Sequence, residues 1–196
     1  MANLEPLSRD EIPEFEPLLE MVEAVMGFVP NSMLTMARWP ELLNSFAGLA
    51  AVVGGPGSVD RGLKHLVALM ASRAAGCRYC QAHTSAGAVG AGVPERKVAE
   101  LWEFETSESF TDPERAALRL ARDAAQVPNL AGPEHFVELE RHFDSRQVVE
   151  LVAQISLFGF LNRWNDTLAT HLEGEPTAVA ERVLGPTGWE PGKHGA

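Results

Sequence analysis

Glycine, proline and small polar residues divide this chain into segments, and nearly every segment repeats its apolar residues at three- and four-residue steps. Between Ser58 and Gly76, for example, Leu63, Leu66 and Met70 recur on one helical face. This spacing is typical of an α-helix with one buried side. No segment shows the strict apolar/polar alternation, bounded by hairpin turns, that indicates strands. The pattern therefore predicts an all-α fold of about eight helices.

Turn and capping residues give the expected bounds of these helices. They cover roughly residues 30–36, 40–53, 58–75, 78–90, 94–102, 111–127, 133–139, 145–171 and 176–184. A chain of 196 residues can bury one substantial core, so we expect residues 1–184 to form a single domain. Residues 185–196 hold four glycines and two prolines, which predicts a flexible C-terminal tail.

The charge balance excludes several classes of partner. The chain has 16 basic and 27 acidic residues, a net charge of −11, and no run of Lys or Arg that would attract nucleic acid or an anionic membrane. Its longest apolar-rich segment, 148–161, is interrupted by Glu150 and Gln154 and is too short to span a bilayer. The acidic, proline-containing N-terminus does not resemble a signal peptide. We therefore expect a soluble, cytoplasmic protein that binds neither nucleic acid nor membrane.

Both cysteines of the chain lie in one CxxC motif, Cys77 and Cys80. In a reducing compartment such a pair is more often redox-active or metal-binding than a permanent crosslink. Gly76 is a natural end for the preceding helix, so the sulfurs fall at the opening of the next one, where the helix dipole favours the thiolate. Thiols in such positions ionise at a pKa of roughly 3.5 to 7.5 instead of about 8.5. We expect mild oxidation to close an intramolecular disulfide.

Two histidines and a threonine are candidate partners of the thiols. His83 and Thr84 follow Cys80 at helical three- and four-residue spacing. His65 lies on the preceding helix, on the face that leads through Leu69 towards Gly76. Four other histidines, at positions 135, 142, 171 and 194, show no partner pattern.

Two further clusters have a structural interpretation. The polar-aromatic run 162–166 on the long C-terminal helix favours a packing or subunit contact, with the lining of the thiol pocket as the alternative. The four glutamates at positions 100, 103, 105 and 108 indicate a solvated acidic face and not paired catalytic carboxylates.

At the level of motifs the chain resembles the AhpD-like superfamily, also called the carboxymuconolactone decarboxylase family. The resemblance rests on the run from Leu63 to His83, which ends in Gly-Cys-Arg-Tyr-Cys-Gln-Ala-His. Segments 29–32 and 39–43 are similar to those that precede this core in the peroxidase-related branch. The resemblance covers roughly residues 25–170 and implies an AhpD-like all-α fold and homo-oligomers, either dimers, trimers or hexamers.

For thiol-bearing members the resemblance implies alkyl hydroperoxide reduction, with no bound cofactor or metal and with a small dithiol or a protein thiol as reductant. Carried over to this chain, Cys80 matches the peroxidatic sulfur and Cys77 the resolving one. The family pattern has a glutamate at the position of His65 and commonly a histidine at that of Thr84. A proton relay here would therefore be rebuilt from His65 and His83.

Three alternatives stay open at this point. Cys77, Cys80, His83 and His65 would supply the two sulfurs and two nitrogens of a tetrahedral zinc site, although three ligands within seven residues would strain it. Carboxymuconolactone decarboxylation is the second alternative, but that branch does not depend on a CxxC pair. The third is a binding protein that has kept the cysteines without using them in catalysis.

Overall fold

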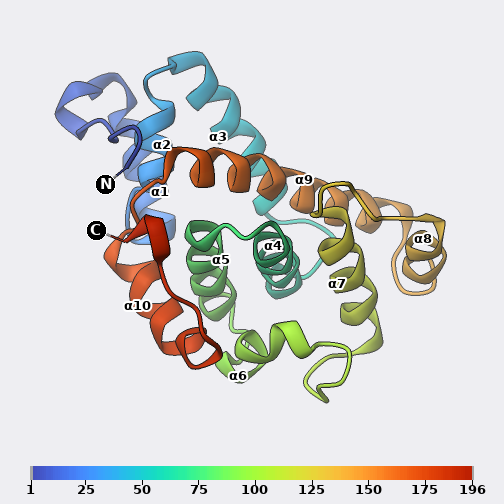
Figure 1. Cartoon of the computed structure of the whole chain (residues 1–196). Helices are drawn as coiled ribbons and strands as arrows, with labels where there is room; N and C mark the ends of the chain where they lie inside the picture. Colours follow the sequence, from blue (N-terminus) through green and yellow to red (C-terminus); the bar gives the residue numbers. More distant parts are fainter. Residues whose placement is uncertain (1, 196) are drawn as a thin grey trace.

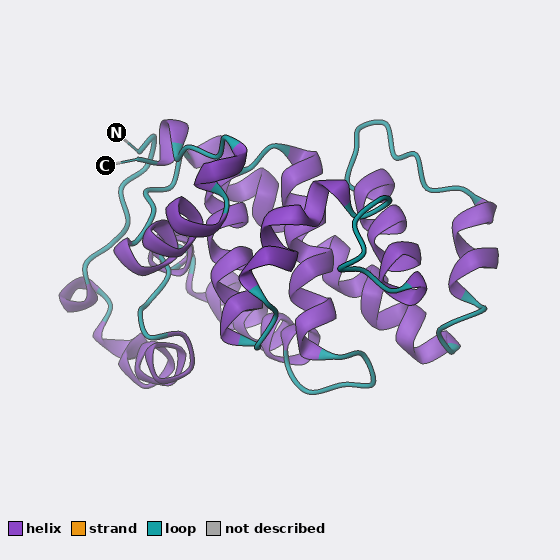
Figure 2. Ribbon diagram, turned by 90° about the horizontal axis from the view of Figure 1, so that it is seen from below, coloured by secondary structure: helices purple, strands orange, loops and turns teal. Residues whose placement is uncertain are grey.

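The protein is described by a computed structural model over residues 2–195, and within that range it contains ten α-helices, five short 3-10 turns and no strand (Figure 1, Figure 2). This confirms the all-α prediction. The helices are α1 (Glu16–Met26), α2 (Asn31–Met36), α3 (Pro40–Gly54), α4 (Arg61–Ala75), α5 (Arg78–Gly90), α6 (Glu95–Ala99), α7 (Asp112–Ala124), α8 (Pro133–Leu139), α9 (Ser145–Leu168) and α10 (Gly174–Val183).

The centre of the fold is α4, which packs against α5, α7 and α9. Its predicted apolar face is buried, with Leu66, Val67 and Met70 at most 1% exposed. The long helix α9 runs across the ends of α4 and α5, and α10 lies along the other side of α5 (Figure 1). The CxxC segment therefore begins beneath α9, where three elements meet.

The N-terminal helices bury a second apolar cluster around Leu19, Met36 and Leu43. Leu161 and Trp164 of α9 pack against this cluster, and Phe160 stacks between Phe46 and Trp164. Trp164 therefore has the packing role that the sequence favoured for it.

A buried ion pair joins α4 to α9, and hydrogen bonds to the same carboxylate hold the loop before α4. Lys64 Nζ lies 3.2 Å from Glu150 Oε2, and the same carboxylate accepts hydrogen bonds from the backbone amides of Ser58 and Val59. These contacts hold the pKa of Glu150 down at about 2, chiefly through the amide of Ser58. The expected range of this helix, 58–75, began too early: α4 starts at Arg61, and the side chain of its N-cap, Asp60, accepts from the amide of Leu63.

The C-terminal segment differs from the flexible tail expected from its glycines and prolines. Residues 185–195 form two 3-10 turns, Gly185–Thr187 and Gly192–His194, and pack against the helices. Trp189 is 5% exposed and His194 is fully buried, while the amide of Leu172 donates to the carbonyl of His194. The aromatic and imidazole side chains anchor a backbone that composition alone predicted to be loose. Residue 196 lies outside the described range.

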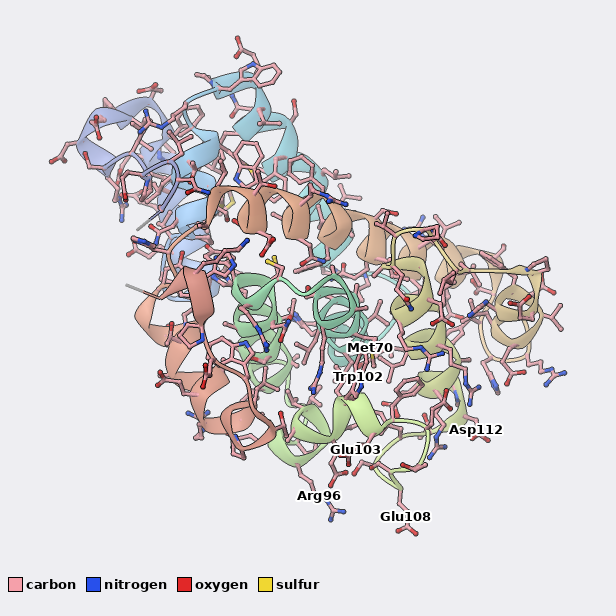
Figure 3. The ribbon with its side chains drawn as sticks, in the orientation of Figure 1. Met70, Arg96, Trp102, Glu103, Glu108 and Asp112 are labelled. Atoms are coloured by element: carbon pink, nitrogen blue, oxygen red, sulfur yellow. The ribbon has the colours of Figure 1, made fainter. Side chains whose placement is uncertain are left out.

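The segment after α6 has the solvated acidic face that the sequence indicated. Glu103 and Glu108 are exposed, and Arg96 and Glu108 project outward in Figure 3. Glu105 pairs with Arg119, and Glu100 accepts from the hydroxyls of two serines, at positions 107 and 109. These carboxylates support the local loop and form no paired acid/base site.

Several apolar side chains remain exposed on α3 and α9. They include Leu49, Val52, Val149 and Phe160, between 41% and 74% exposed. Exposed apolar patches are typical of protein contact surfaces. Self-association stays a prediction, which these side chains support. Among residues 2–195, no helix combines the length and apolar character needed to cross a membrane.

The central position of α4 leads to a stability prediction. Replacing Leu66, which is 1% exposed, with alanine should lower the free energy of unfolding by about 2–5 kcal/mol, because the removed methyl groups leave a cavity. Urea denaturation of wild type and Leu66→Ala measures the difference. The matched control is Val137→Ala on α8, where the side chain is 57% exposed and a change within about 0.5 kcal/mol is expected. Equal losses in both variants would contradict this account of the core.

Candidate active site

A left-handed turn at Gly76 separates α4 from α5 and sets the position of both sulfurs. Gly76 has φ +81°, its amide donates to the carbonyl of Arg73, and the amide of Cys77 donates to the carbonyl of Ser72. This pair of bonds is the glycine-dependent helix stop that the sequence predicted. Cys77 becomes the N-cap of α5, and its Sγ accepts from the amide of Cys80 at 3.5 Å.

The two thiols are free and buried, and their pKa values shift in opposite directions. Hydrogen bonding from the Cys80 thiol is the largest influence on Cys77, and with His194 it outweighs burial and lowers the pKa of Cys77 to about 6. Burial raises the pKa of Cys80 well above its ordinary value, and the nearby Cys77 raises it further. The two shifts favour a thiolate at Cys77 over a thiolate at Cys80.

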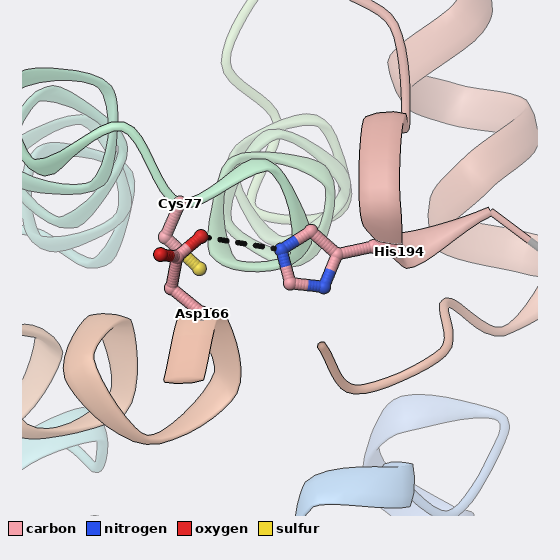
Figure 4. Close-up of side chains that lie close together, drawn as sticks. All are labelled: Cys77, Asp166 and His194. Atoms are coloured by element: carbon pink, nitrogen blue, oxygen red, sulfur yellow. Dashed lines mark ion pairs between the residues drawn. The ribbon is translucent and has the colours of Figure 1, made fainter. Parts of the chain in front are cut away.

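His194, from the C-terminal segment, and Asp166, from α9, complete a cluster with Cys77 (Figure 4). One nitrogen of His194, one carboxylate oxygen of Asp166 and Cys77 Sγ all lie within 4.8 Å of one another. The Nε2 of His194 lies 3.6 Å from Oδ1 of Asp166. His194 is fully buried, whereas the Asp166 side chain is 43% exposed and connects the cluster to solvent.

The hydrogen bonding of His194 fixes which nitrogen faces the sulfur. Its Nδ1 lies 2.8 Å from the carbonyl oxygen of Thr170, which can only accept, so Nδ1 carries a hydrogen. In the neutral ring the lone pair is then on Nε2, which has no hydrogen-bond partner within residues 2–195. Burial tends to lower the pKa of His194, but the Cys77 sulfur and the Thr170 carbonyl outweigh it and raise that pKa. His194 is thus arranged to take the proton of Cys77.

Helix α9 also contacts the second sulfur. The Nδ2 of Asn165 lies 3.6 Å from Cys80 Sγ. Asn165 and Asp166 therefore line the thiol site, which was the alternative interpretation of the 162–166 cluster. His194 was missed because it lies in a segment rich in glycine and proline, more than one hundred residues from the motif, with no periodic neighbour. Its burial was the signal, and that appears only in the folded chain.

His83 belongs to a neighbouring polar cluster. Its Nε2 lies 2.7 Å from Oε2 of Glu173, and its ring stacks on Tyr79 with the centroids 4.3 Å apart. The Tyr79 hydroxyl donates to the other oxygen of Glu173 at 2.8 Å, as does the amide of Asn31. The carboxylate thus joins α2, α5 and the start of α10. Within residues 2–195 no hydrogen bond links His83 to either sulfur.

The structure brings neither His65 nor the Thr84 hydroxyl to the sulfurs. His65 packs against Gly87, which at 1.5 Å per residue lies roughly 10 Å further along α5 than Cys80. Burial lowers the pKa of His65 to about 4, so it is neutral near pH 7. The Thr84 hydroxyl donates to the carbonyl of Cys80 at 2.6 Å, within the helix backbone. The zinc set that included His65 and His83 is therefore not assembled.

A groove of about 670 Å³ reaches Asp166, the partly exposed member of the cluster with Cys77, whereas neither cysteine nor His194 lines it. One wall is α9, and the facing wall combines the last turns of α4 and α7 with residues 126–131. Phe136, Val152 and Ile155 line its apolar part, and Asn162 and Asp166 line its polar part. Asn162 is 4% exposed, and neither side-chain polar atom has a hydrogen-bond partner within residues 2–195. The groove has the size and composition of a small-molecule site.

Comparisons with known proteins place this geometry in a family. Residues 40–123 match the model of the carboxymuconolactone decarboxylase family. The debrominase Bmp8 is 36% identical to this chain. Its structure was solved for a variant in which alanine replaces one cysteine, in complex with 2,3,4-tribromopyrrole. That match covers 92% of this chain and 96% of the other, with a TM-score of 0.86.

Two more distant relatives agree with this assignment. A peroxidase-related protein with an alkylhydroperoxidase AhpD core, from Ralstonia eutropha JMP134, superposes with a TM-score of 0.80 over 89% of this chain and 94% of the other. Its identity of 19% supports the fold alone. The uncharacterized protein YdfG of Bacillus subtilis (strain 168) is 28% identical over 110 residues, which are 55% of this chain and 72% of that protein. With the CxxC motif, the all-α fold and these matches together, the chain belongs to the AhpD-like, carboxymuconolactone decarboxylase superfamily.

Proposed function

We propose that the chain is a thiol-dependent peroxidase that transfers two electrons from the Cys77–Cys80 pair to a small hydroperoxide. The observation that carries this proposal is the contact of Cys77 with His194 and Asp166, and the opposite pKa shifts of the two sulfurs support Cys77 as the nucleophile and Cys80 as the resolving thiol. This exchanges the roles that the family resemblance implied. The physical reason is that Cys77, the N-cap of α5, faces His194 and Asp166, whereas Cys80 lies within the helix; both side chains are buried.

In the first step the Cys77 thiolate attacks the terminal oxygen of the hydroperoxide, and the O–O bond breaks with its electrons on the alkoxide. The alkoxide takes the proton held on His194 Nε2, which gives an alcohol and a sulfenic acid at Cys77. Cys80 then attacks the Cys77 sulfur, and its proton leaves with the hydroxide as water. The resulting disulfide is reduced by a small dithiol or a protein thiol, so no other cofactor takes part.

His194 and Asp166 replace the relay that the sequence assigned to His65 and His83. His194 holds the proton that Cys77 gives up, and the Asp166 carboxylate, 3.6 Å from Nε2, stabilises the charged ring. The retained thiol pair disfavours lactone decarboxylation, since that branch of the family does not need it.

Reductive debromination is the second candidate function, and the 36% identity to a debrominase favours it specifically. Cys77, Cys80 and His194 supply the electrons and the proton that this reaction needs. The Cys77 thiolate takes bromine from a ring carbon, the C–Br electrons stay on that carbon, and the carbon takes a proton from His194. Cys80 then displaces bromide from the sulfenyl bromide, gives its proton to the now neutral His194, and closes the same disulfide. The groove of about 670 Å³, with its apolar wall, is large enough for a halogenated ring.

The first test concerns the charge state of Cys77. The alkylation rate of Cys77 by iodoacetamide, measured by peptide mass mapping between pH 4 and 9, should rise with a midpoint near pH 6, because the thiolate is the reactive form. His194→Ala should move the midpoint upward, towards the ordinary thiol value of about 8.5. His142→Ala, a surface histidine paired with Glu138, is the matched control and should leave the midpoint unchanged. A wild-type midpoint near pH 8.5 would remove the thiolate from the mechanism.

The second test separates the roles of the sulfurs and the histidines. With a dithiol donor, Cys77→Ser should lose peroxide reduction, whereas Cys80→Ser should complete one turnover and leave a sulfenic acid on Cys77 that a dimedone probe traps. His194→Ala should slow the first step by roughly 10² to 10⁴. His65→Ala and His83→Ala should keep most of the rate. A sulfenic acid trapped at Cys80, or a larger loss with His83→Ala than with His194→Ala, would restore the roles implied by the family resemblance.

The third test decides between the two substrate classes. Consumption of cumene hydroperoxide and of a tribromopyrrole is followed under the same dithiol donor, with bromide release as the second readout. We expect both reactions to need Cys77, with the higher kcat/KM identifying the substrate class. Peroxide loss without bromide release supports the peroxidase proposal, and the reverse result supports debromination. If the folded, fully reduced protein shows neither activity, the peroxidase and debrominase proposals are both overturned.

A further inference from the structure

Cys77, Asp166 and His194 bring a sulfur, an oxygen and a nitrogen from three separate segments to one point (Figure 4). Cys77 is the N-cap of α5, Asp166 lies in the last turn of α9, and His194 ends the final 3-10 turn. Catalytic zinc sites combine three protein ligands of these types with one open position. The cluster has that composition.

The spacing of the ligand atoms also suits zinc. With zinc bonds of about 2.3 Å to sulfur and 2.0–2.2 Å to nitrogen or oxygen, a tetrahedral shell separates neighbouring ligand atoms by about 3.4–3.6 Å. The Nε2 of His194 and Oδ1 of Asp166 are 3.6 Å apart, and all three ligand atoms lie within 4.8 Å. Small side-chain rotations would bring the ligand atoms from their present separations to those of a tetrahedral zinc shell.

The hydrogen bonding of His194 orients one ligand for a metal. The Nδ1–H of His194 donates to the Thr170 carbonyl, which leaves Nε2 facing Cys77 and Asp166, and a metal ion there would replace the proton that Nε2 takes from Cys77. Metal-binding histidines are commonly oriented by such a second hydrogen bond. Burial without a partner is costly for a polar nitrogen, and a bound cation would supply the missing partner.

We propose that Cys77, Asp166 and His194 form a reversible Zn²⁺ site, with its fourth position open to solvent on the side of the partly exposed Asp166. Cys80 is not a ligand, because its buried sulfur lies outside this cluster and contacts Nδ2 of Asn165 at 3.6 Å. Zinc binding rests on the geometry of the cluster alone. Its consequence, reversible inhibition by occupation of the nucleophilic sulfur, rests on the proposed function.

The test uses the full-length, reduced protein after chelator treatment. Zn²⁺ is titrated against a chromophoric chelator, and Co²⁺ is used in parallel as a spectroscopic probe for thiolate coordination. Wild type should bind one Zn²⁺ per chain, and Cys77→Ser, Asp166→Asn and His194→Ala should each weaken binding by at least roughly tenfold. Cys80→Ser and His142→Ala are controls that should keep the wild-type affinity, and thermal melts establish that all variants are folded.

The outcomes separate this inference from the proposed function. The proposed site would be overturned if the protein bound no stoichiometric zinc, or if Cys80→Ser and Cys77→Ser weakened the zinc affinity equally. Unaltered affinity in both Asp166→Asn and His194→Ala would do so as well. If the protein reduces peroxide or bromopyrrole, the rate should fall in proportion to zinc occupancy and recover on adding chelator. If it reduces neither, the binding titrations still decide the zinc site by themselves.

Discussion

The turn at Gly76 is the constraint on which the thiol site depends. Its positive φ, which a side chain would strain, ends α4 and directs the chain back so that α5 packs along α4. The same turn leaves the first amides of α5 unpaired, and Cys77 becomes the group that meets one of them. A single backbone conformation thus produces both the central helix pair and the favourable environment of one sulfur.

Two sulfurs one helical turn apart acquire different chemistry because their surroundings differ. Cys77 faces a hydrogen-bond donor and an imidazole, both of which favour a negative charge. Cys80 is enclosed by the interior and by its neighbour's charge, both of which oppose a second thiolate. In the proposed mechanism this difference makes Cys77 the nucleophile and Cys80 the resolving thiol.

The C-terminal segment completes the site from outside the helical core. Trp189 and His194 anchor it by burial, and the Leu172 amide pairs with its backbone. On the other side of Tyr79, Glu173 joins His83 to Asn31 and so ties α5 to α2 and α10. The rings of Tyr79 and His194 lie 6.0 Å apart, so this structural cluster borders the reactive one. His83 and His194, although close together in the fold, therefore have different neighbours.

The sequence alone predicted the class of fold, most of the helix bounds and the importance of the CxxC motif. These features depend on local rules: helical periodicity, glycine and proline at helix ends, and the chemistry of adjacent thiols. The end of α4 at Gly76 and the N-cap position of Cys77 follow from the same rules. Local spacing also suggested His65 and His83 as partners, because both lie at helical intervals that lead to the sulfurs.

Only the tertiary structure decided which groups surround Cys77. Residues 77, 166 and 194 meet through the packing of α5, α9 and the C-terminal turn, and no spacing within the sequence encodes that meeting. The direction of each pKa shift depends on burial and on neighbours across these contacts, so it too appears only in the folded chain. Helical periodicity places a side chain on a face of its own helix, but the packing of the other elements determines what that face meets.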